Sequence, residues 1–321
     1  LRLCFVLEGT LLGYLVALTG GVTFLIASLV AISQSDAKKV LAYSTIANLG
    51  LVVVCAGVGT YESLWAGLLL IVFHAVAKSL LFLCVGTVEH KLESRNIEDM
   101  AGLIVSMPKI SIMMQIGIAG MFLAPFGMLI SKWAVLKALV DYNPLLAVFV
   151  IFGSAATLFF WVKWMGKMIT VVGEYEFLEE GILFSKWLAF YALSALTIGV
   201  CLFFPLLSSF LIEPYVKEIY GRAVAMSRGN IQIMLIMLGM LALFPLSFLQ
   251  YGKRVKVVDA YLGGVNADNN IEFHGAAGAV HTMEMRNYYL EHILRESALL
   301  RFGSMLCGIF LIVMLTSGVV R

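Results

Sequence analysis

The chain has 321 residues, of which 61% are hydrophobic and only 13% charged. Several apolar runs are longer than the roughly 18 residues that mark a transmembrane helix, so the sequence is that of a multi-spanning membrane protein. The net charge of +2 is small and spread over the loops. No Arg/Lys-rich stripe of the kind that nucleic acid requires is present, and this excludes nucleic-acid binding.

The fold class that the pattern predicts is all-α, a polytopic membrane protein with about eight transmembrane helices, one of them discontinuous. The spans are expected at about 10–32, 40–58, 63–88, 110–140, 145–170, 186–212, 230–250 and 300–320. Residues 1–250 then form one transmembrane domain, residues 251–299 a polar loop, and residues 300–321 the last helix. Leu1 is not an initiator Met, so we expect a piece of a longer polypeptide.

The Lys/Arg bias predicts an orientation. If the spans alternate, most of the basic residues fall on one side, beginning with Lys38 and Lys39, and the positive-inside rule makes that side cytoplasmic. The 251–299 loop would then be cytoplasmic and the carboxy terminus outside. Within this loop the pattern predicts an amphipathic helix from about His281 to Arg295, which could dock against a partner subunit.

His74 and Lys78 lie in the middle of the third apolar run, four residues apart and therefore on one face of a helix. A charged side chain at bilayer depth costs about 2.5 to 3.5 kcal/mol, so such residues are rare unless they pair, face a hydrated cavity or move ions. Both residues are candidates for proton translocation. The alternative for His74 is a neutral core histidine hydrogen-bonded to a neighbouring helix.

The fourth run is too long for one straight span. Its 31 residues would make a helix of roughly 46 Å, against a hydrocarbon core of about 30 Å. Pro125 and Gly127 predict a break, and Lys132 follows directly after it. Broken helices at membrane depth commonly carry ion sites, so Lys132 is a third candidate for proton translocation. The alternative is that Lys132 snorkels to an interface, although Lys137 is better placed for that.

Other charged residues lie near the ends of the spans. Lys38 is either a proton-translocation residue or a solvated anchor at a helix end. Glu89 and His90 end the third span and could form a proton exit or only a polar rim. Lys163 and Lys167 are expected to snorkel at the end of the fifth span.

Cysteine and histidine spacing gives no metal or cluster site. The three histidines of the polar loop lack zinc-ligand spacing, and the five cysteines lie singly in apolar segments, where free cysteines are small core residues. Nor does the chain carry a nucleophile–base pair or a cofactor fingerprint. We therefore expect no catalytic centre, metal or cofactor in this chain. The cysteines are Cys4, Cys55, Cys84, Cys201 and Cys307.

Four segments of this chain, in this order, together resemble a known family. They are Gln34–Ile46, Phe73–His74 with Lys78–Phe82, Gly86, and Ile130–Lys132. Together they resemble the antiporter-like subunits shared by respiratory complex I, Mrp-type sodium/proton antiporters and energy-converting membrane-bound [NiFe] hydrogenases. The later stretch Val258–Gly264 is similar to the large membrane subunit of the ferredoxin-linked, Ech-type hydrogenases. The chain would correspond to the carboxy-terminal half of a longer member.

The resemblance implies a fold of two inverted five-helix repeats, each with a discontinuous helix and with buried Lys, Glu and His along a central axis. It implies that Lys132 lies on the second broken helix, that His74 and Lys78 belong to the axis, and that Lys38 belongs to the loop motif. The family's Glu and Lys of the first repeat have no counterpart here and are expected upstream of Leu1. Leu70 stands where the family often has a second His.

The function that the resemblance implies is ion translocation in the cell membrane, driven by redox chemistry in partner subunits. A NiFe centre and iron–sulfur clusters are expected in those membrane and soluble partners. Protons are expected rather than sodium, because the spans show no carboxylate-rich oxygen cage of the kind that hard cations prefer. The alternatives are a stand-alone or Mrp-type sodium/proton antiporter subunit and a purely structural membrane anchor.

Overall fold

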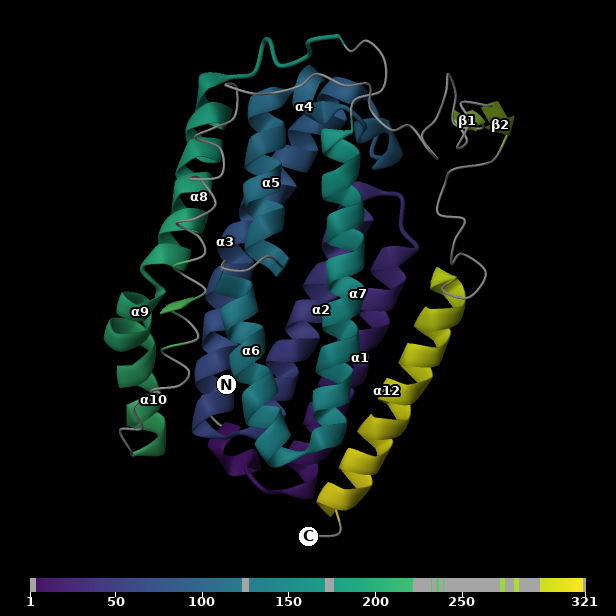
Figure 1. Ribbon diagram of the computed structural model, residues 1–321. Helices are drawn as coiled ribbons and strands as arrows, with labels where there is room; N and C mark the ends of the chain where they lie inside the picture. Colours follow the sequence, from purple (N-terminus) through teal and green to yellow (C-terminus); the bar gives the residue numbers. More distant parts are fainter. Residues whose placement is uncertain are drawn as a thin grey trace.

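The computed structural model describes residues 4–122, 127–170, 176–221, 272–274, 280–282 and 295–319, with a few isolated positions between 232 and 239. In this part the chain is almost entirely helical, and seven segments are long and apolar enough to cross a membrane. Figure 1 shows most of them as a bundle of roughly parallel and antiparallel helices. The predicted all-α membrane fold is confirmed, whereas most of the span predicted at 230–250 lies outside the described residues.

The first two long helices, α1 (Leu11–Ile32) and α2 (Ala37–Val58), pack closely as an antiparallel pair. A Cβ atom on Gly20 would lie only 2.6 Å from the Gly50 carbonyl oxygen, so the two backbones touch. Small residues allow such contact between membrane helices. Asp36 starts α2, because its side chain accepts hydrogen bonds from the first free backbone N–H groups of the helix.

The central helix of the bundle is α3 (Tyr61–Leu92), which contacts α2, α5, α6 and α8. It has 32 residues and is longer than the predicted span at both ends. At about 1.5 Å per residue it exceeds the hydrocarbon core of a bilayer, so its last turns reach beyond that core. Glu89 and His90 lie in these last turns.

Helices α5 (Pro108–Phe122) and α6 (Gly127–Tyr142) lie on either side of residues 123–126, within one long apolar segment. The break predicted there falls on residues outside the described part of the chain and stays a prediction. Pro125 itself lies outside the described residues. The backbone N–H of Gly127 donates to Cys201 Sγ at 3.1 Å, so α8 supplies a partner for the free start of α6.

Helix α7 (Pro144–Ile169) follows and packs against α1 and α6. Asn143 starts it by accepting a hydrogen bond from the backbone N–H of Leu145, with proline at the first helical position. The short element η1 (Cys4–Leu7) precedes α1, and η2 (Glu98–Met100) and α4 (Leu103–Ser106) lie between α3 and α5.

The span predicted at 186–212 is not one continuous helix. It consists of α8 (Phe184–Leu202), α9 (Phe204–Leu207) and the π-helical turn η3 (Ser208–Ile212), followed by α10 (Glu213–Tyr220). The break lies at Phe203, where the backbone leaves the helical region. Pro205 explains it, because proline lacks an N–H and clashes with the carbonyl four residues earlier.

The carboxy-terminal part holds a short antiparallel hairpin, β1 (Glu272–His274) and β2 (Val280–Thr282), and the last helix, α12 (Glu296–Val319). The amphipathic helix predicted from about His281 is wrong at its start, because His281 and Thr282 belong to β2; most of its remainder lies outside the described residues. Helix α12 stands beside α1 at the edge of the bundle (Figure 1).

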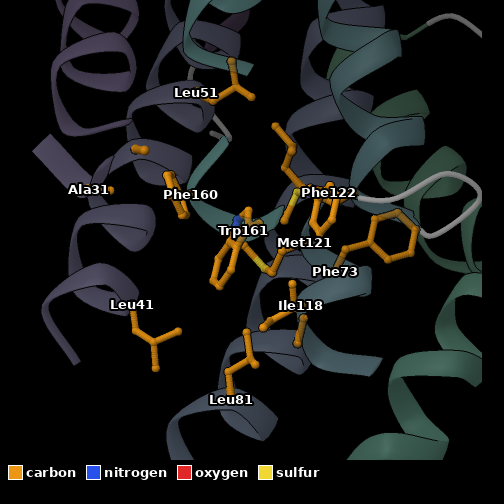
Figure 2. Close-up of a cluster of buried hydrophobic side chains, with 14 of the residues drawn as sticks. Ala31, Leu41, Leu51, Phe73, Leu81, Ile118, Met121, Phe122, Phe160 and Trp161 are labelled. Atoms are coloured by element: carbon orange, nitrogen blue, oxygen red, sulfur yellow. The ribbon is translucent and has the colours of Figure 1, made fainter. Parts of the chain in front are cut away.

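The buried hydrophobic core draws side chains from α1, α2, α3, α5, α6 and α7. Figure 2 shows Phe73, Phe122, Phe160 and Trp161 converging there. Four of the five cysteines are buried, as expected of small core residues, and Cys307 on α12 is half-buried.

Candidate functional site

Lys78 lies on the central helix α3 and is buried, with only 5% of its surface exposed. Its ammonium donates hydrogen bonds to the Leu41 carbonyl oxygen at 2.9 Å and to Ser44 Oγ, both on α2. It also lies 5.0 Å from the centre of the Trp161 ring on α7, a cation–π contact. A buried ammonium needs such partners, since the cost of leaving water is otherwise uncompensated.

Lys132 lies on α6, about one and a half turns after its first described residue, Gly127, and is also buried. Its ammonium donates to Thr157 Oγ1 on α7 at 3.1 Å and faces the Phe24 ring of α1 at 5.8 Å. The side chain therefore points into the bundle and does not snorkel. It reaches a cavity of about 360 Å³ between α6 and α7 that is lined mostly by apolar residues.

The two lysines share one kind of environment. Each ammonium is held by a hydroxyl group that is itself hydrogen-bonded to its own helix: Ser44 Oγ to the Leu41 carbonyl and Thr157 Oγ1 to the Ser154 carbonyl. Each hydroxyl accepts a hydrogen bond from an ammonium group and donates one to a backbone carbonyl.

His74 stands one turn before Lys78 on α3. Its Nδ1 atom is buried and has no hydrogen-bond partner among the residues that the structure describes. The alternative predicted for His74 was a neutral histidine hydrogen-bonded to a neighbouring helix. In the described part of the chain, Nδ1 makes no such hydrogen bond. Gly127 on α6 packs directly against the ring of Phe73, the residue before His74. A Cβ atom at position 127 would collide with that ring.

Lys38, Glu89 and Arg95 form a second charged group where α2 begins and α3 ends. The Glu89 carboxylate pairs with both basic side chains, so two candidates from different helices do meet. The hydrogen bond to Glu89 raises the pKa of the Arg95 guanidinium above its ordinary value. His90 is exposed and lines the same open pocket of about 850 Å³.

Lys163 and Lys167 have a protein partner that was not predicted. Both ammonium groups pair with the carboxylate of Glu98, at 3.8 Å and 2.5 Å. Glu98 belongs to η2 and its side chain is only 5% exposed. The i, i+4 spacing of the lysines was visible in the sequence, but their buried partner is 65 residues away along the chain and carries no local signal.

Sequence reasoning also missed Ser44, Thr157 and Trp161. Thr157 and Trp161 are four residues apart on α7, so they share a face, and this face contacts both buried lysines. Helix α7 thus joins the two ammonium groups. Chemically, the arrangement provides two separated buried proton-binding groups, each with a hydroxyl partner, and an imidazole one turn from Lys78.

With this geometry described, the chain can be compared with known proteins. Residues 1–159 match the family described as NADH:quinone oxidoreductase/Mrp antiporter, TM. The matched part is just under half of the chain. It includes Lys78, Lys132, His74 and both hydroxyl partners of the lysines.

Among the antiporter-type relatives is the chloroplastic NAD(P)H-quinone oxidoreductase subunit 5 of Zygnema circumcarinatum, which is 33% identical over 54% of this chain and 25% of its own length. A second is the putative antiporter subunit mnhA2 of Staphylococcus aureus, 30% identical over 49% of this chain and 24% of its own length. The chain thus spans about a quarter of the length of these curated relatives.

A solved structure, that of the membrane-bound sulfane sulfur reductase, an archaeal respiratory membrane complex, has a similar fold. It aligns with a TM-score of 0.57 and 23% identity over 71% of this chain and 43% of the other chain. The antiporter-like resemblance is thus confirmed at the level of the family, and the relatives belong to multisubunit membrane complexes.

Proposed function

We propose that this chain is a proton-translocating membrane subunit of a redox-driven complex in the cell membrane. The observation that carries the proposal is the pair of buried lysines on α3 and α6, both contacted by one face of α7. A structural anchor has no need of two buried cations, whose burial costs several kcal/mol each by order of magnitude.

In this mechanism the lysines change protonation in turn. Each ammonium can give up one proton and become an amine. A proton that arrives at Lys78 repels the positive charge on Lys132, because Coulomb interactions are strong where water is excluded. Lys132 then releases its proton into the adjoining cavity. Rearrangements in partner subunits would alternate the access to the two lysines.

The redox partner that we propose is a ferredoxin-linked, membrane-bound [NiFe] hydrogenase. The support is the resemblance of Val258–Gly264, which lies outside the described residues, and the similarity of the fold to a subunit of an archaeal respiratory complex. The NiFe centre and iron–sulfur clusters would lie in partner subunits. The basic side that carries Lys38 would face the cytoplasm, and α12 would end on the opposite side.

A second candidate is a subunit of a sodium/proton antiporter of the Mrp type. The Staphylococcus aureus relative, named as a putative antiporter subunit, favours it. The two candidates differ in their driving force. A redox-linked subunit copurifies with redox subunits, whereas an antiporter exchanges sodium for protons without them.

The experiment uses the purified native complex in proteoliposomes, where a potassium diffusion potential drives proton uptake and a pH-sensitive dye reports it. Lys78→Met and Lys132→Met should each lower the proton flux at least tenfold. Lys137→Met is the matched control, because Lys137 lies on α6 as well but is one-third exposed. Full flux in both buried-lysine variants would refute the proposal.

A further inference from the structure

We propose that Glu98, with Lys163 and Lys167, is the proton-exchange site that connects the buried lysines to the aqueous side on which α7 ends. The inference rests on the proposed function and assigns to it a proton-carrying carboxylate. In the sequence, Glu89 and His90 were the candidates for a proton exit.

The carboxylate of Glu98 bridges the ammonium groups of Lys163 and Lys167. Glu98 presents one carboxylate oxygen to each lysine: Oε1 lies 3.8 Å from Lys163 Nζ and Oε2 lies 2.5 Å from Lys167 Nζ. The three side chains differ in exposure, with 5% for Glu98, 15% for Lys163 and 30% for Lys167. The carboxylate therefore joins an inner ammonium to one that meets the solvent.

This order of exposure suits proton transfer. The ammonium of Lys163 can pass a proton to the carboxylate, which leaves an amine and a carboxylic acid. After Lys167 has released its own proton to water, the acid can protonate the Lys167 amine and become a carboxylate again. Each step breaks one N–H or O–H bond and forms another, and the cluster ends with one proton moved outward.

The cluster also lies on the helix that joins the two buried lysines. Along α7, Thr157 contacts Lys132, Trp161 contacts Lys78, and Lys163 and Lys167 follow within two turns. Trp164 stacks on Trp161 at 5.9 Å between ring centres, and its buried Nε1 has no hydrogen-bond partner in the described part of the chain. The whole series spans about 15 Å along the helix axis.

The alternative site is less suited to exchange with the interior. Glu89 is already held by both Lys38 and Arg95, and these two basic side chains are 40% and 57% exposed. None of the three touches α7 in the contacts that the structure records. Glu98 is the acid that is both buried and bonded to α7.

The test uses the native complex in the same proteoliposomes. Glu98→Gln removes the acid but leaves two lysines without their partner, and this variant could fail to fold. The double variant Glu98→Gln/Lys163→Met removes one charge of each sign, and such neutral replacement of a buried ion pair is commonly tolerated. Glu89→Gln is the matched control at the exposed acid.

We expect the double variant to assemble with a normal melting temperature and to lose at least tenfold in proton flux, while Glu89→Gln keeps most of it. Infrared difference spectra after a pH jump should show a carboxylic C=O band that disappears in the double variant. If Lys78→Met and Lys132→Met abolish flux but the double variant conducts normally, the exchange site is wrong and the proposed function stands. If none of these variants lowers the flux, the proposed function fails as well.

Discussion

Thr157 and Trp161 lie one helical turn apart on α7, and each contacts a different buried lysine: Thr157 the ammonium of Lys132, Trp161 that of Lys78. The two lysines belong to helices on either side of this face. Any shift or rotation of α7 therefore changes the surroundings of both cations together. This gives a physical route by which a movement in a partner subunit could act on two proton sites.

The hydroxyl of Thr157 can be tested by Thr157→Val, which keeps the shape and removes the hydrogen bond to Lys132. Leaving a buried ammonium without this acceptor should cost about 1–3 kcal/mol and lower both the melting temperature and the proton flux. Thr197→Val is the control, because the buried hydroxyl of Thr197 bonds only within its own helix. Equal behaviour of the two variants would show that the Thr157 contact contributes nothing particular.

The start of α6 can be tested by Gly127→Ala. The added methyl group would overlap the Phe73 ring, so that ring must move, and overpacking of this kind costs about 1–3 kcal/mol. We expect a lower melting temperature in detergent and a reduced flux, since His74 follows Phe73. Gly166→Ala on α7 meets no atom within 4 Å, so it should leave the flux unchanged and should not lower the melting temperature, since Ala is the better helix former. A stabilised Gly127→Ala protein would contradict this packing.

The two acids at the same side of the bundle should differ in their effect on stability. Glu89→Gln breaks ion pairs that are partly exposed, which are worth only about 0–1 kcal/mol. Glu98→Gln leaves two lysines facing a site that is buried, and breaking a buried pair typically costs about 3–5 kcal/mol. Thermal unfolding in detergent, at low and high salt, checks this order. Salt should weaken only the contribution of Glu89, and a reversed ranking would be inconsistent with the burial of Glu98.

The packing of α12 on α1 can be tested with a native cysteine. Cys307 Sγ lies 3.8 Å from Thr23 Oγ1, so Thr23→Cys should form a disulfide with Cys307 under mild oxidation. Mass spectrometry of the digested protein detects the linked peptides. Cys307→Ser in the same background must abolish the link. Failure to form it would mean that α12 does not sit on this face of α1.

Much of the architecture could be predicted from the sequence, because long apolar runs fix the membrane helices. The break at Phe203 was missed although Pro205 was visible, since the apolar pattern continues across it. Lys78 and Lys132 were found because a buried charge is unusual in an apolar run. Glu98 could not be found in this way: it lies in a polar connection, and only the folded chain shows that it is buried and faces α7.

Polar contacts hold α12 mainly at its first turn, where Glu296 accepts a hydrogen bond from the Tyr43 hydroxyl at 2.5 Å. Most of the helix beyond that point is exposed and packs chiefly on α1. A force applied at the carboxy-terminal end of α12 would therefore detach the helix one contact at a time, and the hydrogen bond between Tyr43 and Glu296 would break last. In a pulling trace this helix would appear as a separate early step, before the tightly joined α1 and α2 come apart.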